Sequence, residues 1–125
     1  MAARVGLLLG DPCGVGPELV AKLLGDGDLS TDIETVVIGD PRVLAQGQEI
    51  AGVRLDLPVV ASLDHGEGNR LLQGPPIDPA DLTVGEAGGA AGKAVLDTFR
   101  FALELAEDHQ LAAICFARPV IQFIA

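Results

Sequence analysis

The stretch from Gly10 to Glu18, with the sequence GDPCGVGPE, constrains the possible fold more than any other part of the chain. It joins an apolar run at Val5–Leu9 to a helical pattern of apolar residues that begins at Leu19. Three glycines allow positive φ angles and close backbone approach, while Pro12 and Pro17 stiffen the turn and favour the start of a helix. We therefore expect a rigid strand-to-helix turn, and open α/β sheets bind their ligands at such carboxyl ends of strands.

Strand-like and helix-like segments continue to alternate further along the chain. Thr35–Gly39 repeats the buried character of the first strand, and Asp40 with Pro41 supplies an N-cap and a first-turn proline for a short helix to about Gln46. Ala112–Ala117 is a third buried-type strand. Because right-handed crossovers make successive strands parallel neighbours, the predicted fold class is α/β, with a mainly parallel sheet and flanking helices.

The middle of the chain is less regular. Val53–Leu57 alternates apolar and polar residues, which predicts an edge or half-exposed strand. Glycines and prolines interrupt residues 62–81, which predicts a loop of roughly 20 residues. Thr83–Glu86 is a capping box, and apolar residues then recur at helical spacing to Ala106, which predicts the longest helix. Gly25 is expected to end the first helix as a C-terminal glycine.

The candidate binding residues in the first turn are Gly10, Asp11, Pro12, Gly14, Gly16 and Glu18. Their glycine spacing matches neither a P-loop nor the dinucleotide turn G-x-G-x-x-G, and the Asp11 carboxylate would repel a pyrophosphate. An acidic loop can instead accept hydrogen bonds from a hydroxyl or amino group, or hold a basic side chain. The alternative is a rigid connection that binds no ligand.

The two histidines and two cysteines follow no metal-ligand spacing, so no metal site is predicted within this chain. His65 is expected to be a solvated loop histidine, although acidic residues lie near it in the sequence. His109 is expected to cap the long helix, where a cation favours the dipole. Cys13 and Cys115 are expected to be reduced, and the acidic residues around Cys13 oppose its activation as a nucleophile.

Charge and hydropathy exclude several classes of partner. The formal net charge is -10 and the eight Lys and Arg residues form no run, so neither nucleic acid nor an anionic membrane surface is an expected partner. No segment approaches the ~18 apolar residues of a membrane span, and no signal peptide is recognised. Hydrophobic residues make up 49% of the chain, as in a globular protein. We expect a cytoplasmic protein.

All nine residues of Gly10–Glu18 match the signature G-D-P-x-G-[IV]-G-P-E, so the chain resembles the 4-hydroxythreonine-4-phosphate dehydrogenases. That family includes relatives that oxidise 4-phospho-threonate or 4-phospho-erythronate. A weaker match covers Leu82–Gly92 and the strand at Ala112–Ala117. The chain thus resembles the N-terminal part of a family member. Where the family continues with an alanine-proline pair and a lysine, residues 118–125 form an atypical tail without lysine.

The resemblance implies a fold like the N-terminal part of the isocitrate and isopropylmalate dehydrogenases. It further implies NAD-dependent oxidation, with decarboxylation, of a phosphorylated hydroxy-amino or hydroxy acid such as 4-phosphohydroxy-threonine, in pyridoxal phosphate synthesis or related catabolism. A divalent metal would polarise the oxidised oxygen. Members of the family are homodimers with the site in a cleft between two domains.

The family's metal-binding histidines and its phosphate-binding residues lie outside the matched region. We therefore expect residues 1–125 to form a single α/β domain or a fragment of a larger two-domain enzyme, and to be inactive alone. Whether the chain is itself an enzyme stays open at this point. The alternative is a non-catalytic α/β module for ligand binding or assembly.

Overall fold

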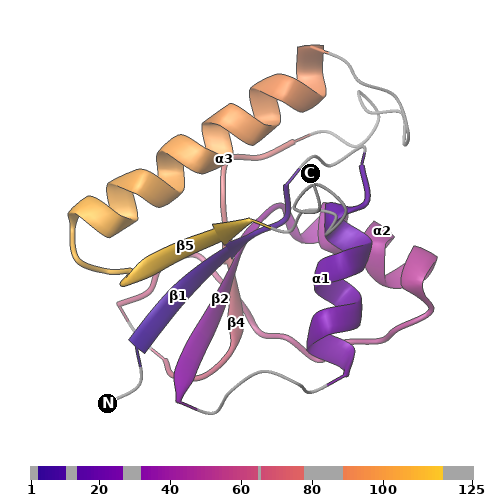
Figure 1. Cartoon of the computed structure of the whole chain (residues 1–125), viewed down its shortest axis with the longest axis horizontal. Helices are drawn as coiled ribbons and strands as arrows, with labels where there is room; N and C mark the ends of the chain where they lie inside the picture. The colour runs from indigo at the N-terminus through magenta and orange to yellow at the C-terminus, as the bar shows by residue number, and fades with distance from the viewer. Residues whose placement is uncertain (1–2, 11–13, 27–31, 65, 78–88, 117–125) are drawn as a thin grey trace, which may run out of the picture.

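The computed structural model describes residues 3–10, 14–26, 32–64, 66–77 and 89–116 (Figure 1). Within them the chain forms an α/β fold, as predicted. The elements are β1 (Ala3–Leu8), α1 (Gly16–Gly25), β2 (Ile33–Gly39), α2 (Pro41–Ala51), β3 (Val59–Val60), β4 (Arg70–Gln73), α3 (Gly89–Glu107) and β5 (Ala113–Phe116). None of the helices in these ranges combines the length and the apolar character that a membrane crossing requires.

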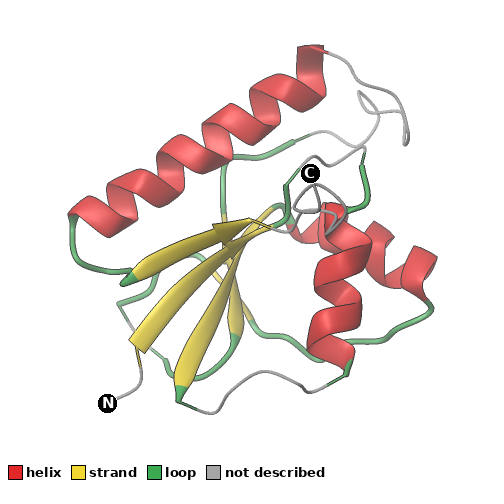
Figure 2. Cartoon of the chain, viewed as in Figure 1, coloured by secondary structure: helices red, strands yellow, loops and turns green. Residues whose placement is uncertain are grey.

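The strands form one parallel sheet in the order β3-β4-β2-β1-β5. Leu8 near the end of β1 aligns with Ile38 of β2 and with Phe116 of β5. The chain first moves from β1 through β2 to β3, and later crosses in the opposite direction from β4 to β5. Since crossovers keep one hand, this reversal places α3 on the opposite face of the sheet from α1 and α2 (Figures 1 and 2).

Side chains alternate between two apolar layers, one on each face of the sheet. The layer beneath α1 and α2 contains Leu7, Leu9, Val20, Ala21, Val37, Val43, Leu44 and Leu71. The layer beneath α3 contains Leu8, Val36, Ile38, Leu63, Leu72, Ala102 and Leu111. Because both faces are covered, the central strands are continuous apolar runs, and this is the feature that identified β1 and β2 in the sequence.

The first helix, α1, ends at Gly25 as predicted, whereas the end of the second helix differs from the prediction. Asp26 follows Gly25 with right-handed helical angles, so no left-handed glycine cap closes α1. A Cβ on Gly25 would lie 2.6 Å from Cγ1 of Val53, so close packing requires the glycine there. The second helix does not end near Gln46 but continues to Ala51, and Gly52 caps it with φ 69°.

Two predictions for the middle of the chain were wrong. Val53–Leu57 forms no strand, and β3 comprises only Val59–Val60. The alternation instead reflects Leu55 and Leu57 packing against the apolar layer beneath α1 and α2. The predicted loop at residues 62–81 contains the strand β4, whose residues Arg70, Leu71 and Leu72 are buried. In the sequence, glycines precede this strand and prolines follow it. The predicted capping box and residues 78–81 lie outside the described residues.

The backbone conformation of His109, two residues after the end of α3, closes this long helix. This residue has φ 61°, in the left-handed region that glycine or asparagine usually occupies at this position. Its N–H donates to the carbonyl of Ala106 at 3.1 Å, and the N–H of Gln110 donates to the carbonyl of Leu105 at 2.9 Å. His109 thus lies at the predicted helix end, where its backbone conformation closes the helix.

Gly47 of α2 packs against the first turn of α1, and this contact yields a stability prediction. A Cβ at residue 47 would lie 2.5 Å from both the carbonyl carbon and the carbonyl oxygen of Pro17. We expect Gly47→Ala to lower the free energy of unfolding by about 1–3 kcal/mol, because the two helices must separate. Urea unfolding followed by circular dichroism measures the change.

Gly92→Ala is the matched control, because no atom lies within 4 Å of the Cβ position at residue 92 of α3. Alanine should stabilise that helix by about 0.5–1 kcal/mol. A Gly47→Ala protein as stable as the Gly92→Ala protein would contradict the packing described for α1 and α2.

Candidate functional site

The carboxyl ends of the parallel strands meet at one edge of the sheet. β1, β2 and β4 end at Leu8, Gly39 and Gln73, and the chain leaves them at Gly10, Asp40 and Gly74. The N–H of Gly74 donates to the carbonyl of Gly39 at 3.1 Å, so a hydrogen bond joins the end of β2 to the segment that follows β4. The strand order reverses beside β1, and α/β folds bind ligands at such a point.

Four of the six candidate residues lie in the described part of the first turn. Gly10 has φ 79°, which explains the need for glycine directly after β1. Gly14 is exposed, whereas Gly16 is buried at the start of α1. Glu18, in the first turn of α1, pairs with Lys22 at 3.8 Å. Asp11 and Pro12 lie outside the described residues, so their role in a site stays a prediction.

A small cavity connects this turn to the rest of the carboxyl edge. Its volume is about 10 Å³, and its lining includes Gly10 after β1, Gly39 and Asp40 after β2, and Thr98 of α3. The cavity has room for about one water molecule and no substrate. It shows that Gly10 lies beside the end of β2 and beneath α3.

A larger cleft of about 210 Å³ lies at the ends of β2 and β4. Its walls are Asp40, Pro41, Arg42, Gln73, Gly74 and Pro76. The sequence predicted Asp40 as an N-cap, and its carboxylate accepts the N–H of Arg42 at 2.9 Å. The cleft itself was not predicted because one of its walls depends on β4. The glycines and prolines of residues 62–81 had indicated a loop in place of that strand.

Asp40 joins the cleft walls through its buried carboxylate, whose side chain is 4% exposed. Besides its cap bond, the carboxylate accepts Nε of Arg42 at 3.1 Å and Nη2 at 2.9 Å. It also accepts the N–H of Ile77 at 3.0 Å, and the Arg42 guanidinium donates to the Ile77 carbonyl. One carboxylate therefore fixes the start of α2 and the segment after β4 together.

These hydrogen bonds keep Asp40 ionised. Burial raises the pKa of the Asp40 carboxyl, but bonds from the Arg42 side chain and from the N–H groups of Ile77 and Arg42 outweigh burial. The pKa therefore lies below its ordinary value. A carboxylate with this many donors suits a structural role at the edge of a cleft better than the role of a proton acceptor.

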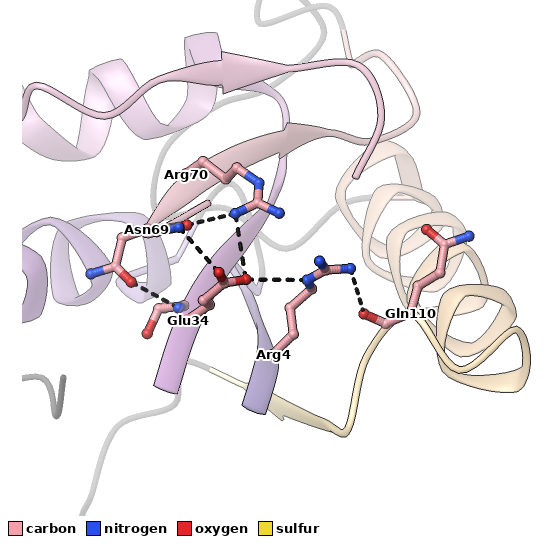
Figure 3. Close-up of polar contacts among 7 residues, drawn as sticks. Arg4, Glu34, Asn69, Arg70 and Gln110 are labelled. Carbon is pink, nitrogen blue, oxygen red and sulfur yellow. Dashed lines mark hydrogen bonds and ion pairs between the residues drawn. The ribbon is translucent and has the colours of Figure 1, made fainter. Parts of the chain in front are cut away.

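A second polar network lies at the amino edge of the sheet (Figure 3). The Glu34 carboxylate lies between Arg4, at 3.3 Å, and Arg70, at 3.6 Å, and accepts the N–H of Gly68 at 3.2 Å. The Gly68 bond is the main cause of a lowered pKa for Glu34. Arg4 also donates to the carbonyl of Gln110, so this network connects β1, β2 and β4 with the segment between α3 and β5.

The described residues supply no ligand set for the divalent metal that the family resemblance implies. No group of three or more His, Cys, Asp or Glu side chains gathers within the ranges that the structure describes. His65 and Cys13 fall outside those ranges. Cys115 is a free, exposed thiol on β5, and His109 follows α3. No step of a reaction can therefore be assigned to a metal on the described part of this chain.

Comparisons with known proteins support the resemblance. The chain is 40% identical over 116 residues to a Rhizobium meliloti (strain 1021) protein provisionally named 4-hydroxythreonine-4-phosphate dehydrogenase 2, covering 90% of this chain and 33% of that protein. It is similar along most of its length to the 4-hydroxythreonine-4-phosphate dehydrogenase family. No protein-family model matches the chain.

Two further relatives extend the family match. A Clostridium botulinum (strain Hall) protein, provisionally named D-threonate 4-phosphate dehydrogenase, is 32% identical and covers 88% of this chain and 34% of its own length. The crystal structure of a Burkholderia phymatum 4-hydroxythreonine-4-phosphate dehydrogenase superposes with a TM-score of 0.80 at 26% identity, covering 93% of this chain and 36% of that one. The chain thus spans about a third of the length of these dehydrogenases.

The charge on Asp40 yields a prediction for the pH dependence of stability. Asp40→Asn keeps an N-cap acceptor but removes the negative charge. At neutral pH it should lower the free energy of unfolding by about 1–2 kcal/mol, a value reduced by solvent screening because the Arg42 side chain is exposed. The folded-state pKa lies below the ordinary 3.8, so the stabilisation is complete above that pH. It disappears as the pH falls through the folded-state pKa.

Urea unfolding of both proteins between about pH 7 and pH 3 measures this effect, and the two stabilities should converge in acid. Asp97→Asn is the matched control, because its pair with Lys93 is a surface i,i+4 contact that contributes at most ~0.5 kcal/mol. A constant difference between wild type and Asp40→Asn across this pH range would show that the charge of Asp40 contributes nothing.

Proposed function

We propose that this chain supplies the β1–α1 turn of a dehydrogenase site that oxidises a phosphorylated hydroxy-amino or hydroxy acid with NAD and a divalent metal. The observation that carries this proposal is the position of Gly10–Glu18. This turn leaves the carboxyl end of β1, where the strand order reverses, and it carries the residues that resemble the family signature. The names of the relatives support the substrate class.

The role proposed for the turn is to orient the substrate or cofactor. Asp11 would accept a hydrogen bond from a hydroxyl or amino group, while Gly10 and Gly14 leave the backbone open to approach. Bound NAD would accept the hydride. We also propose a homodimer in the cytoplasm, with the metal ligands coming from outside the described residues.

The alternative function is a non-catalytic α/β module for ligand binding or assembly. Both proposals place a ligand at the same edge of the sheet, so catalysis distinguishes them.

The first test concerns the chain alone. We expect no reduction of NAD by the purified 125-residue protein with 4-phosphohydroxy-threonine and a divalent metal, because its two histidines, His65 and His109, follow no metal-ligand spacing. Absorbance at the NADH wavelength is the readout, with a metal-free sample as blank. NADH formation above this blank would show that the chain is a complete enzyme.

The second test transfers the chain into a relative. Replacing the matched segment of the Rhizobium meliloti protein by this chain should give an active chimera, because the fold is shared. In that chimera, Asp11→Asn should lower kcat/KM roughly 10- to 150-fold with little change in melting temperature, since a charge-assisted hydrogen bond contributes about 1.5–3 kcal/mol.

Asp26→Asn at the other end of α1 serves as the control and should leave kcat/KM unchanged. If Asp11→Asn and Asp26→Asn behave alike in an active chimera, the turn is a connector and the module alternative gains support. A decrease in melting temperature without a kinetic change would indicate that Asp11 only braces the start of α1.

A further inference from the structure

Arg70 has a buried guanidinium with unused hydrogen-bond donors. The residue is 1% exposed. Its Nη1 donates to the carbonyl of Gly68 at 2.7 Å and lies 3.6 Å from the Glu34 carboxylate. Its Nε and Nη2 have no hydrogen-bond partner among the residues that the structure describes, and Figure 3 shows no dashed line at either nitrogen. Buried donors normally have a partner, because an unpaired donor loses the free energy of its hydration.

The two unpaired donors form one edge of the guanidinium plane. The N–H groups of Nε and Nη2 on this edge point in nearly the same direction, so they can bind two oxygens of one planar anion. Arg42 shows the same edge with a partner, since its Nε and Nη2 donate to the Asp40 carboxylate oxygens at 3.1 and 2.9 Å. The corresponding edge of Arg70 therefore has the geometry that a carboxylate or a similar oxyanion requires.

The charges around this edge favour an anion. Arg4 and Arg70 share the single carboxylate of Glu34, so two cations and one anion leave one net positive charge. Glu34 lies on the Nη1 side of Arg70 and also accepts hydrogen bonds from Arg4 and Gly68, so it does not serve the other edge. The formal net charge of -10 is screened beyond about 8–10 Å, so the positive charge of the network decides the local preference.

The position of Arg70 limits the size of the anion. Its side chain lies on the face of the sheet beneath α3, as does that of Leu72 two residues later. Gly68, whose carbonyl accepts Nη1, is exposed, and no atom lies within 4 Å of its Cβ position. The guanidinium therefore lies just beneath a thin cover. An ion as small as formate or nitrate can reach it, whereas a phosphorylated metabolite requires an open cleft.

We propose that the Nε–Nη2 edge of Arg70 binds a small planar oxyanion of the carboxylate, nitrate or bicarbonate class. The anion neutralises the excess positive charge of the Arg4–Glu34–Arg70 network and supplies the acceptors that both donors lack. Because Arg70 begins β4 and Glu34 lies in β2, the bound ion strengthens the attachment of β4 to the sheet. The site lies at the amino edge of the sheet, so it is independent of the function proposed for the Gly10–Glu18 turn.

Thermal unfolding of the 125-residue chain in sodium formate tests the site. Two charge-assisted hydrogen bonds support a dissociation constant in roughly the millimolar range. An anion that binds only the folded chain raises its melting temperature. At about 50 mM formate, the increase for the wild type should exceed that for Arg70→Met by at least ~3 °C, and it should saturate with concentration. Because both proteins are measured in the same salt, general salt effects cancel.

Two further variants sharpen the comparison. Arg54→Met is the matched control, because Arg54 is exposed and its loss should leave the response to formate intact. Arg70→Lys keeps the positive charge but has no planar edge with two donors, so it should recover less than half of the wild-type response. Circular dichroism verifies that each variant is folded.

Heteronuclear NMR of the arginine side chains tests the site in the wild-type chain, even if the Arg70 variants do not fold. The signal of the Arg70 Nε–H should shift saturably as formate is added. The Nε–H of Arg42 is the internal control, because it already donates to Asp40 and should not shift.

Two results would overturn the proposal. Equal responses of wild type and Arg70→Met to formate would show that the salt acts on the protein in general. An Arg70 Nε–H signal that stays unchanged up to about 0.1 M formate would show that water satisfies these donors instead.

Discussion

The carboxyl edge of this protein depends on one buried carboxylate. Asp40 follows β2 directly and caps α2, and its carboxylate accepts hydrogen bonds from Arg42 and from the N–H of Ile77. Without that charge, the segment after β4 would lose its attachment to α2, and the 210 Å³ cleft would lose one wall. A charged group in this position is stable only because several donors compensate its burial.

The parallel sheet explains why the other functional elements lie near this carboxylate. All described strands run in one direction, so every turn that follows a strand emerges at the same edge, and the reversal beside β1 opens a place for a ligand there. The amino edge of the sheet has a structural role instead. Its Arg4–Glu34–Arg70 network joins strands that are distant in sequence, and it encloses Arg70 at 1% exposure.

Local patterns in the sequence predicted local features, and long-range packing decided the rest. The apolar runs of β1 and β2, the cap at Asp40 and the body of α3 followed from periodicity and turn chemistry. The strand β4 was missed because its four residues lie between glycines and prolines and pair with distant β2. The packing roles of Gly25 and Gly47 could not be predicted either. Each glycine leaves room for a residue far along the chain, Val53 for Gly25 and Pro17 for Gly47.

The candidate site was predicted only in part, for the same reason. The signature turn could be identified from its residues, but the cleft, the Arg42–Asp40–Ile77 contacts and the amino-edge network depend on tertiary pairing that no short window contains. The proposal that the Gly10–Glu18 turn contacts the ligand of a dehydrogenase can be examined in a crystal structure of the chimera with NAD and the phosphorylated hydroxy acid bound. We expect atoms of residues 10–18 to lie within hydrogen-bond distance of the substrate or of NAD. A ligand bound in the cleft without any contact to this turn would overturn the proposal.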